Sequence, residues 1–242
     1  MIHRFDTGRG LGPLDLHHPA GARLAVVGGI GSGKTVLLQV LAGLRELQSG
    51  LLTLDGAPLD QDHLRAHWAG IGWVPQDAFL FSVSLRENLA MGRPQATEEE
   101  LWEVARVACL DDLIRRLPMG LDTVVGERGV SLSGGERQRT ALARALLRKP
   151  RLVLLDDALS AVDSETEARI LENLRAFLDG VTLVLATHRV FVAELCDRVL
   201  VLENGRAVQD GTPQELALVP GHFARIRKLQ SLEREILGKA SA

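Results

Sequence analysis

The 242-residue chain is poor in several features, and each shortage excludes a class of protein. Its two cysteines, Cys109 and Cys196, lie far apart and without the spacing of metal ligands. A disulfide framework or zinc site is therefore not expected, and a reducing compartment is the default. No apolar run approaches the roughly 20 residues that cross a bilayer, and residues 1–12 lack the basic start and apolar stretch of a signal peptide. We expect the chain by itself to span no membrane.

Basic residues form no block or stripe. The net charge is −3, and the 28 Lys and Arg are scattered along the chain. A nucleic-acid binder would carry a basic stripe, so the charge pattern argues against that class. With 46% apolar residues, the chain can bury a substantial core, as one large domain or as one domain with a subdomain.

Short apolar runs alternate with longer helical patterns. This alternation predicts an α/β fold with a largely parallel sheet. Residues 77–133 hold helical patterns (98–110 and 111–117) without a strong strand, which indicates a helical insertion in a core of about 1–76 and 134–216. Apolar residues at every third or fourth position predict a C-terminal helix at about 222–238. The predicted strands are 24–27, 71–74, 152–155, 182–186 and 199–202.

Capping patterns mark three helix starts. Each pairs a hydroxyl residue with a glutamate three positions later, as in a capping box. The three pairs are Thr97 with Glu100, Ser133 with Glu136, and Ser164 with Glu167.

A complete phosphate loop follows the first predicted strand and precedes an amphipathic stretch at 36–44. Its glycines let the backbone curl so that successive N–H groups point at phosphate oxygens, and the following helix adds its positive dipole end. Lys34 can reach the β and γ phosphates of a nucleoside triphosphate, and Thr35 offers a hydroxyl to Mg²⁺. The loop consists of Gly28, Gly29, Ile30, Gly31, Ser32, Gly33, Lys34 and Thr35.

An apolar strand at 152–155 ends in two carboxylates, Asp156 and Asp157. Ligands of open α/β sheets bind beyond the carboxyl ends of the strands, so Asp156 is the expected Mg²⁺ ligand. Asp157 is positioned to polarise the water that attacks the γ phosphate.

The segment Leu132 to Glu136 provides a second anion site. Ser133 caps a helix whose next two residues are Gly134 and Gly135, which leaves bare N–H groups for an anionic oxygen. This segment resembles the signature motif of ATP-binding cassette (ABC) proteins. With the phosphate loop before it and the Asp156 strand after it, the chain resembles an ABC nucleotide-binding domain. The resemblance covers about residues 5–216 and implies the ABC ATPase fold: a P-loop NTPase core, an antiparallel β subdomain and a helical subdomain.

The resemblance implies a head-to-tail dimer, in which the signature helix of one domain covers the ATP bound by another. Gln76 resembles the glutamine that senses Mg²⁺ and the attacking water, and Asp163 lies in the segment that crosses to the opposite nucleotide. His188 resembles the switch histidine at the γ phosphate, and Phe5 the aromatic that stacks on adenine. The motifs around Phe81 and Glu127 are similar to those of multidrug or peptide exporters.

Exporter kinship implies a second nucleotide-binding domain and a transmembrane domain as partners, the latter contacted near Gln76 and Glu127. ATP and Mg²⁺ are the implied ligands, nucleic acid is not a partner, and the location is the cytoplasmic face of the inner membrane. The chain begins four residues before Phe5, where the family usually has a further strand. We expect a domain excised from a longer transporter, with a separate subunit as the alternative.

Two side chains depart from the family pattern. Asp157 stands where the catalytic residue is usually Glu, which shortens the reach of the carboxylate by about 1.5 Å. Because an error near 1 Å can cost on the order of 100-fold in rate, binding should survive while turnover suffers. This resembles the degenerate site of a heterodimeric exporter, whose partner supplies the Glu. The second departure, Glu136 in place of Gln, adds a negative charge beside the anion contacts.

Three functions remain open. The first is the ATPase domain of an ABC exporter, which closes on ATP and reopens on hydrolysis. The alternative is a nucleotide-gated dimerisation module that binds ATP and hydrolyses it very slowly, and Asp157 separates the two. A soluble ABC ATPase acting on DNA or ribosomes would carry a coiled-coil insertion, a tandem cassette or a basic arm, none of which the sequence contains.

Overall fold

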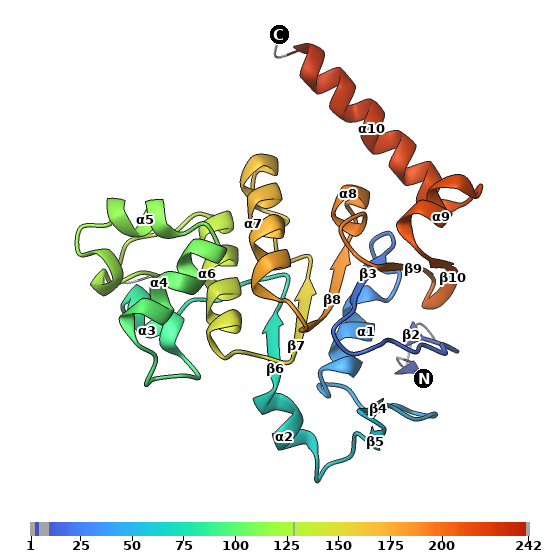
Figure 1. Cartoon of the computed structure of the whole chain (residues 1–242), viewed down its shortest axis with the longest axis horizontal. Helices are drawn as coiled ribbons and strands as arrows, with labels where there is room; N and C mark the ends of the chain where they lie inside the picture. The colour runs from blue at the N-terminus through green and yellow to red at the C-terminus, as the bar shows by residue number, and fades with distance from the viewer. Residues whose placement is uncertain (1–2, 5–9, 128, 241–242) are drawn as a thin grey trace. The chain divides into compact units, whose positions relative to one another are not determined.

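The computed structural model describes residues 3–4, 10–127 and 129–240, and for 3–4 and 233–240 it describes the backbone alone. Two compact units make up the chain: Met1–Trp68 with Thr182–Ala242, and Ala69–Val181. Both contain helices and strands (Figure 1). None of the helices in these described stretches combines the length and apolar character that crossing a bilayer requires.

The first unit contains a mixed sheet with β3 at its centre. The strand order is β10-β9-β3-β8, in which β3 is parallel to β8 and β9, and β10 is antiparallel to β9. Residues 24–27 are completely buried, as expected for a strand covered on both faces. Three predicted strands are confirmed as β3, β8 and β9. The elements are β1 (His3–Arg4), β2 (Gly10–Leu11), β3 (Arg23–Val27), α1 (Lys34–Leu41), β4 (Thr53–Leu54), β5 (Ala57–Pro58), α2 (Leu64–Ala69), β8 (Thr182–Thr187), α8 (Val190–Ala193), β9 (Arg198–Glu203), β10 (Arg206–Gly211), α9 (Pro213–Leu218) and α10 (His222–Ala240).

Helices cover this sheet. α1 contacts β8 and buries Leu37 and Leu38, while α8 contacts β3 and β8. α10 packs against α8 and α9 and is anchored by the fully buried Phe223. From this anchor the helix runs away from α9 to the C-terminus (Figure 1).

Two tight hairpins of the first unit were not predicted. β9 and β10 are joined by Asn204 and Gly205, with φ of 50° and 77°, and β4 and β5 by Asp55 and Gly56, with φ of 51° and 80°. Asn-Gly and Asp-Gly favour two-residue turns that need positive φ at both positions.

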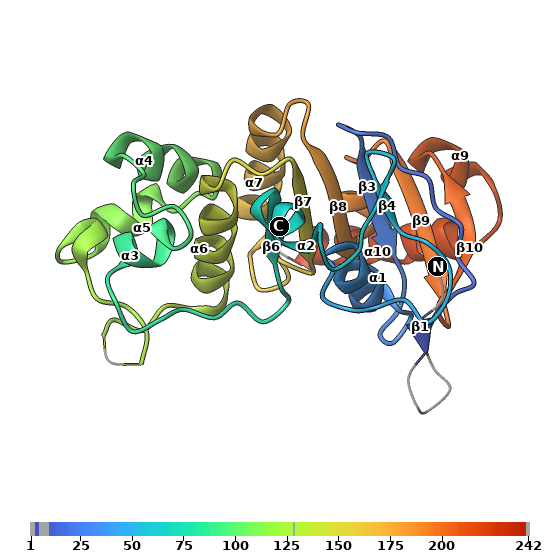
Figure 2. The ribbon, with the colours of Figure 1, turned by 90° about the horizontal axis from the view of Figure 1, so that it is seen from below.

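The second unit contains the parallel pair β6 and β7, which confirms two further predicted strands. α6 contacts β6, α3 and α4. Figure 2 shows α3, α4 and α5 gathered beside α6. The helical patterns at 98–110 and 111–117 correspond to α4 and α5, and α4 ends three residues early. The elements are β6 (Ile71–Val74), α3 (Leu85–Ala90), α4 (Glu98–Val107), α5 (Asp111–Arg116), the 3₁₀ helix η1 (Gly120–Asp122), α6 (Gly134–Leu147), β7 (Leu152–Asp156) and α7 (Ser164–Phe177).

The capping boxes at Thr97 and Ser133 are confirmed, and the one at Ser164 is wrong. α7 is capped one residue earlier by Asp163, whose Oδ1 accepts a hydrogen bond from Thr166 N (2.9 Å). Asp163 has the extended backbone of an N-cap, whereas Ser164 is already helical. Further capping boxes start α3 at Ser84 and α9 at Thr212.

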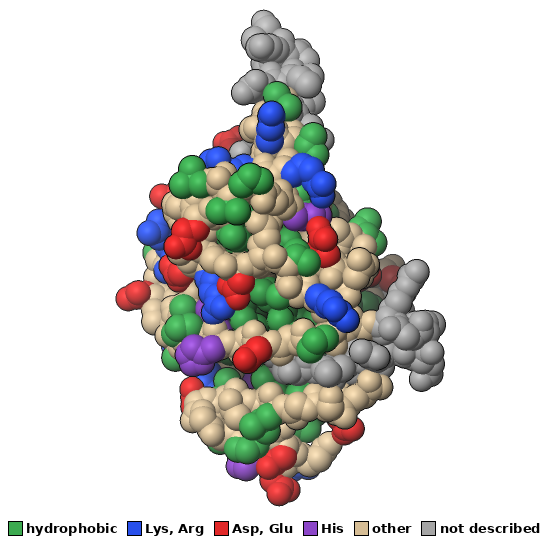
Figure 3. All heavy atoms as spheres, turned by 90° about the vertical axis from the view of Figure 1, so that its right-hand side faces the viewer, with side chains coloured by type: hydrophobic (Ala, Val, Ile, Leu, Met, Phe, Trp, Pro, Cys, Tyr) green, Lys and Arg blue, Asp and Glu red, His purple; other side chains and the backbone are tan. Residues whose placement is uncertain are grey.

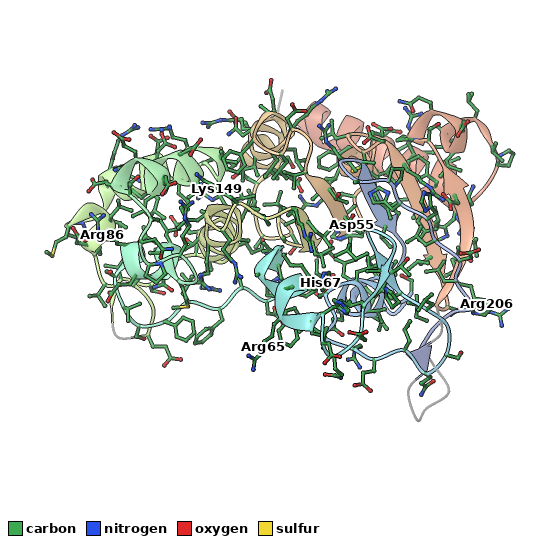
Figure 4. All side chains as sticks on the ribbon, turned by 60° about the horizontal axis from the view of Figure 1, so that its bottom comes forward. Asp55, Arg65, His67, Arg86, Lys149 and Arg206 are labelled. Atoms are coloured by element: carbon green, nitrogen blue, oxygen red, sulfur yellow. The ribbon has the colours of Figure 1, made fainter. Side chains whose placement is uncertain are left out.

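Ion pairs fasten the surface helices of the second unit. Arg86 on α3 bonds Asp122 of η1 (2.6 Å), and Lys149 bonds Glu100 on α4 (2.9 Å). Figure 4 labels both basic residues, together with His67 and Arg65 on α2 of the other unit. The bond from Lys149, helped by the Thr97 backbone, lowers the pKa of Glu100 to about 2.

Both cysteines are free and buried. Burial raises the pKa of the Cys196 thiol to about 12, which keeps it protonated and unreactive at neutral pH.

Asn88 is a fully buried polar hub of the second unit. Its Oδ1 accepts hydrogen bonds from Phe81 N (3.0 Å) and Arg144 Nη2 (2.9 Å). Its Nδ2 donates to Phe81 O (2.9 Å), and the backbone carbonyl of Asn88 accepts from Arg144 Nε (2.8 Å). One side chain therefore ties the loop before α3 to α6.

We predict that Asn88→Ala lowers the free energy of unfolding by about 2–3 kcal/mol, because Phe81 and Arg144 would keep buried groups without partners. Urea denaturation measures the change. Asn173→Ala is the matched control: its amide makes longer contacts (3.3 Å to Arg106 O and Val107 O), so its cost should stay below about 1 kcal/mol. An equal loss of unfolding free energy in the two variants would contradict the role of Asn88 as a polar hub.

Candidate nucleotide site

The phosphate loop lies between β3 and α1 in the first unit. Gly31 and Gly33 have φ of 77° and 106°, left-handed conformations that favour glycine. Gly33 is also the N-cap residue of α1, and no side chain caps the helix. No side chain therefore stands in front of this helix start, where the positive end of the helix dipole favours an anion.

The hairpin between β9 and β10 supports this loop. Gly205 N donates a hydrogen bond to Ser32 O (2.9 Å), and Gly12 N donates to Gly205 O (2.7 Å). A Cβ at Gly28 would overlap Leu202 O and Ser32 Oγ, whereas one at Gly29 would meet nothing within 4 Å. Backbone contacts thus fix one side of the loop and leave the other open.

Lys34 is folded back over the loop. Its Nζ donates to Gly28 O (2.8 Å) and Gly29 O (3.1 Å), and the residue is only 8% exposed. A buried ammonium on a flexible stem, held beside a glycine-rich loop and a helix N-terminus, has the charge and reach to bind phosphate oxygens.

Strand register brings His188 to the same edge of the sheet. Val27 of β3 pairs with Thr187 of β8. The next residue after β3 is Gly28, and the next after β8 is His188. Because parallel strands end at a common edge, the histidine emerges beside the start of the phosphate loop. Its side chain is exposed.

In the second unit, register brings the other candidates together. Val74 of β6 pairs with Leu155 of β7, so Gln76 and Asp156 emerge at one strand edge. Asp156 is 3% exposed at the end of β7. Asp157 follows with a φ of 45°, a left-handed conformation that Asp tolerates better than most residues. The Asp156 carboxylate is a hard oxygen donor, the kind of ligand that Mg²⁺ selects.

At the N-terminus of α6, Glu136 completes a capping box. Glu136 Oε2 accepts a hydrogen bond from Ser133 N (2.8 Å), and Ser133 Oγ accepts one from Glu136 N (3.2 Å). The carboxylate is thereby turned back onto the helix start. Gly135 has no room for a side chain, since a Cβ would lie 2.7 Å from Ala161 O.

Gln138, a site residue that the sequence analysis missed, links two loops to α6. Its Nε2 donates to Gln76 O (3.3 Å) and Ser160 Oγ (3.0 Å), and its Oε1 accepts from Ala161 N (2.9 Å). The side chain is 5% exposed. A sequence signal was available: Gln138 continues the buried stripe of 141, 142 and 145, so a polar side chain stands in an apolar pattern.

Two predicted site residues remain, Asp163 and Phe5. Asp163 caps α7, and its bond from Thr166 N lowers the pKa of the carboxyl below its usual value. Phe5 lies outside the described residues. Within the described stretches, no three His, Cys, Asp or Glu side chains cluster as a metal site.

Residues 11–160 match the family described as ABC transporter. The chain belongs to the ABC transporter family. The match runs from β2 through the phosphate loop, the signature and the Asp156 strand to Ser160, and ABC domains bind ATP.

Relatives of known name extend this ABC assignment. The chain is 40% identical over 218 residues to "ABC transporter B family member 24, mitochondrial" of Arabidopsis thaliana, covering 90% of this chain and 32% of that protein. It is 41% identical over 215 residues to the "ATP-dependent lipid A-core flippase" of Legionella pneumophila (strain Paris), covering 89% and 37%. The chain thus spans about a third of the length of these relatives.

A solved structure gives the same result. The "Structure of a bacterial Atm1-family ABC exporter with ATP bound" superposes with a TM-score of 0.83 at 38% identity, covering 87% of this chain and 37% of that one. The predicted ABC ATPase fold, with a mostly parallel sheet and an antiparallel part, is confirmed. The chain is an ABC ATPase domain, and it is similar in sequence and structure to the corresponding domain of a bacterial ABC exporter.

Substitution by Ala should affect ATP affinity very differently at two adjacent glycines of the phosphate loop, Gly28 and Gly29. Gly28→Ala should lower ATP affinity about 10-fold or more, because relieving the overlap with Leu202 and Ser32 costs about 1–3 kcal/mol. Gly29→Ala should change it less than about 2-fold, since its Cβ meets no atom. Titration with a fluorescent ATP analogue measures both, with Tm as the check on folding. Equal affinities would show that contact with Leu202 does not shape the loop.

Proposed function

We propose that this domain binds ATP with Mg²⁺ and drives a membrane exporter through ATP-dependent, head-to-tail dimerisation. The observation that carries the proposal is the phosphate loop, in which left-handed glycines, an uncapped α1 and the buried Lys34 form one anion-binding surface. The glycine-flanked start of α6 offers a second anion site. In a head-to-tail dimer, the γ phosphate would be held between the phosphate loop of one copy and Ser133, Gly134 and Gly135 of the other.

Each remaining side chain has a proposed role. Lys34 and the loop N–H groups bind and orient the phosphates. Asp157 accepts a proton from the attacking water, Gln76 orients that water, and His188 donates to the γ phosphate. Mg²⁺, when bound with ATP, neutralises phosphate charge, and Thr35, Asp156 and Gln76 would hold it. Phe5 would stack on adenine, and Asp163 would approach the opposite nucleotide.

The proposed contact with a transmembrane domain centres on an exposed aromatic pair. Phe79 and Phe81 are 65% and 44% exposed, and their rings meet edge to face at 5.0 Å. Gly126, next to Glu127, lies against Phe81 O, and Val125 N donates to Val83 O (3.0 Å). Exposed apolar rings beside Glu127 suit a loop from a membrane domain. The complex would act at the cytoplasmic face of the inner membrane.

The alternative function is a nucleotide-gated dimerisation module that hydrolyses ATP very slowly. Asp157 favours it, because its carboxylate is one carbon shorter than that of Glu. In that case the chain would be the degenerate-site subunit of a heterodimer, and a Glu-bearing partner would supply the hydrolytic site. Its own Ser133 to Glu136 segment would then complete the partner's active site.

We predict that Asp157→Glu raises ATP turnover by about 10- to 100-fold, because the longer carboxylate regains the reach of a general base. Asp157→Asn should abolish turnover yet form a stable dimer with ATP, seen by sedimentation velocity. Lys34→Ala, which removes a phosphate ligand, should neither bind ATP nor dimerise.

The same series separates the two functions. High wild-type turnover with no gain from Asp157→Glu would favour a homodimeric exporter over the degenerate site. A folded Asp157→Asn protein that stays monomeric with saturating ATP and Mg²⁺ would contradict dimerisation.

We predict that Ser133→Ala lowers ATP turnover about 10-fold or more at concentrations where the wild type dimerises, because the partner's γ phosphate would lose a ligand. Thr97→Ala is the matched control, since both variants remove a capping box and should cost about 1 kcal/mol of stability. Coupled ATPase assays and thermal melts measure the two effects. Similar loss of turnover in both variants would mean that Ser133 acts through stability alone.

A further inference from the structure

Gln230 on α10 binds the backbone that carries His188. Its Nε2 donates to His188 O (2.8 Å), and its Oε1 accepts from Val190 N (2.8 Å). One amide thus bridges an acceptor and a donor two residues apart, from a helix 40 residues downstream. All these groups belong to the first unit.

The bridge satisfies a donor that α8 leaves open. Val190 is the first residue of α8, and Arg189 at the N-cap makes no side-chain capping bond. First-turn N–H groups need partners from outside their helix, and Gln230 supplies one. Arg189 N donates to Thr187 Oγ1 (3.0 Å). The peptide backbone over residues 188–190 is therefore held at three successive points.

α10 is fixed in the position that this bridge requires. Phe223, Arg227 and Gln230 follow one another at spacings of four and three residues, which puts them on one face of the helix. Phe223 is fully buried and anchors the helix, whereas Arg227 Nε makes only a solvent-exposed pair with Glu194 Oε1 (2.6 Å), which contributes little to holding the helix. Other Lys and Arg side chains lie along the exposed side of the described part of α10 (Figure 3).

Hydrogen bonds, rather than close packing, hold the amide. A groove of about 610 Å³ opens between α8 and α10, and Gln230 lines it together with Val190 and Phe191. The amide therefore borders open space on this side. Loss of its two bonds would remove two of the three hydrogen bonds described for the 188–190 backbone.

We infer that Gln230 is a positioning residue for ATP hydrolysis: it fixes the peptide from which the His188 imidazole projects toward the γ phosphate. The inference rests on the proposed function, because it assigns His188 to that phosphate. It makes the C-terminal helix part of the support of the active site.

The test compares Gln230→Met with Arg227→Met in the full 242-residue chain. Met keeps the length and helix propensity of Gln but removes both hydrogen bonds. Gln230→Met should lower the single-turnover rate of ATP hydrolysis about 10-fold, with ATP affinity within about 2-fold of wild type, since small displacements of a catalytic group cost rate. Arg227→Met breaks the neighbouring α8–α10 contact and should leave both quantities within about 2-fold.

Amide hydrogen exchange at Val190, followed by NMR, measures whether the hydrogen bond from Val190 N to Gln230 is intact, independently of ATPase activity. Exchange should accelerate in Gln230→Met and not in Arg227→Met. Gln230→Glu is a second variant: it can accept from Val190 N but has no donor for His188 O, so it should also slow hydrolysis. Faster Val190 exchange with an unchanged rate, or unchanged exchange, would overturn the inference.

A His188→Ala background separates this inference from the proposed function. His188→Ala alone should slow hydrolysis, and adding Gln230→Met should slow it no further, because the two residues act as one unit. Full activity of His188→Ala would refute the proposed role of His188. Additive losses in the double variant would instead refute the link from Gln230 to His188.

Discussion

Parallel strand pairing is the constraint on which the rest of this domain depends. Because parallel neighbours end at a common edge, the pairing of Val27 with Thr187 delivers the phosphate loop and His188 to one place. The pairing of Val74 with Leu155 does the same for Gln76 and the two aspartates. The backbone thus assembles groups that are far apart in sequence, and the loops need only carry the right side chains.

Much of the fold could be predicted because its strands are buried on both faces and read as short apolar runs. β10 could not, since most of its residues are exposed and it has no such run; the turn signal at Asn204 and Gly205 was its only local mark. The start of α7 was misplaced because Asp163 and Ser164 can each cap a helix. Only their backbone conformations decide between them.

The residues of the candidate site likewise fall into those that the sequence predicts and those that it does not. The phosphate loop, Asp156 and the α6 start could be predicted because each is a local motif with its own hydrogen-bonding logic. Glu136 illustrates this, since a capping box accepts Glu or Gln and leaves the neighbouring glycines unchanged. Gln138 and Gln230 were missed because their partners are distant in sequence, at 22, 23 and 62 residues for Gln138 and 40 and 42 for Gln230, and no spacing rule connects an amide to such groups.

The bridge made by Gln138 has a mechanical consequence. A glutamine amide carries two donor hydrogens, and here one goes to Gln76 and the other to Ser160, while its oxygen binds Ala161. If either loop shifted alone, a nearly buried polar group would lose its partner, at a cost of about 1–3 kcal/mol. The loop that carries Gln76 and the loop that carries Ser160 and Ala161 are therefore mechanically coupled. A displacement of one loop requires a matching displacement of the other.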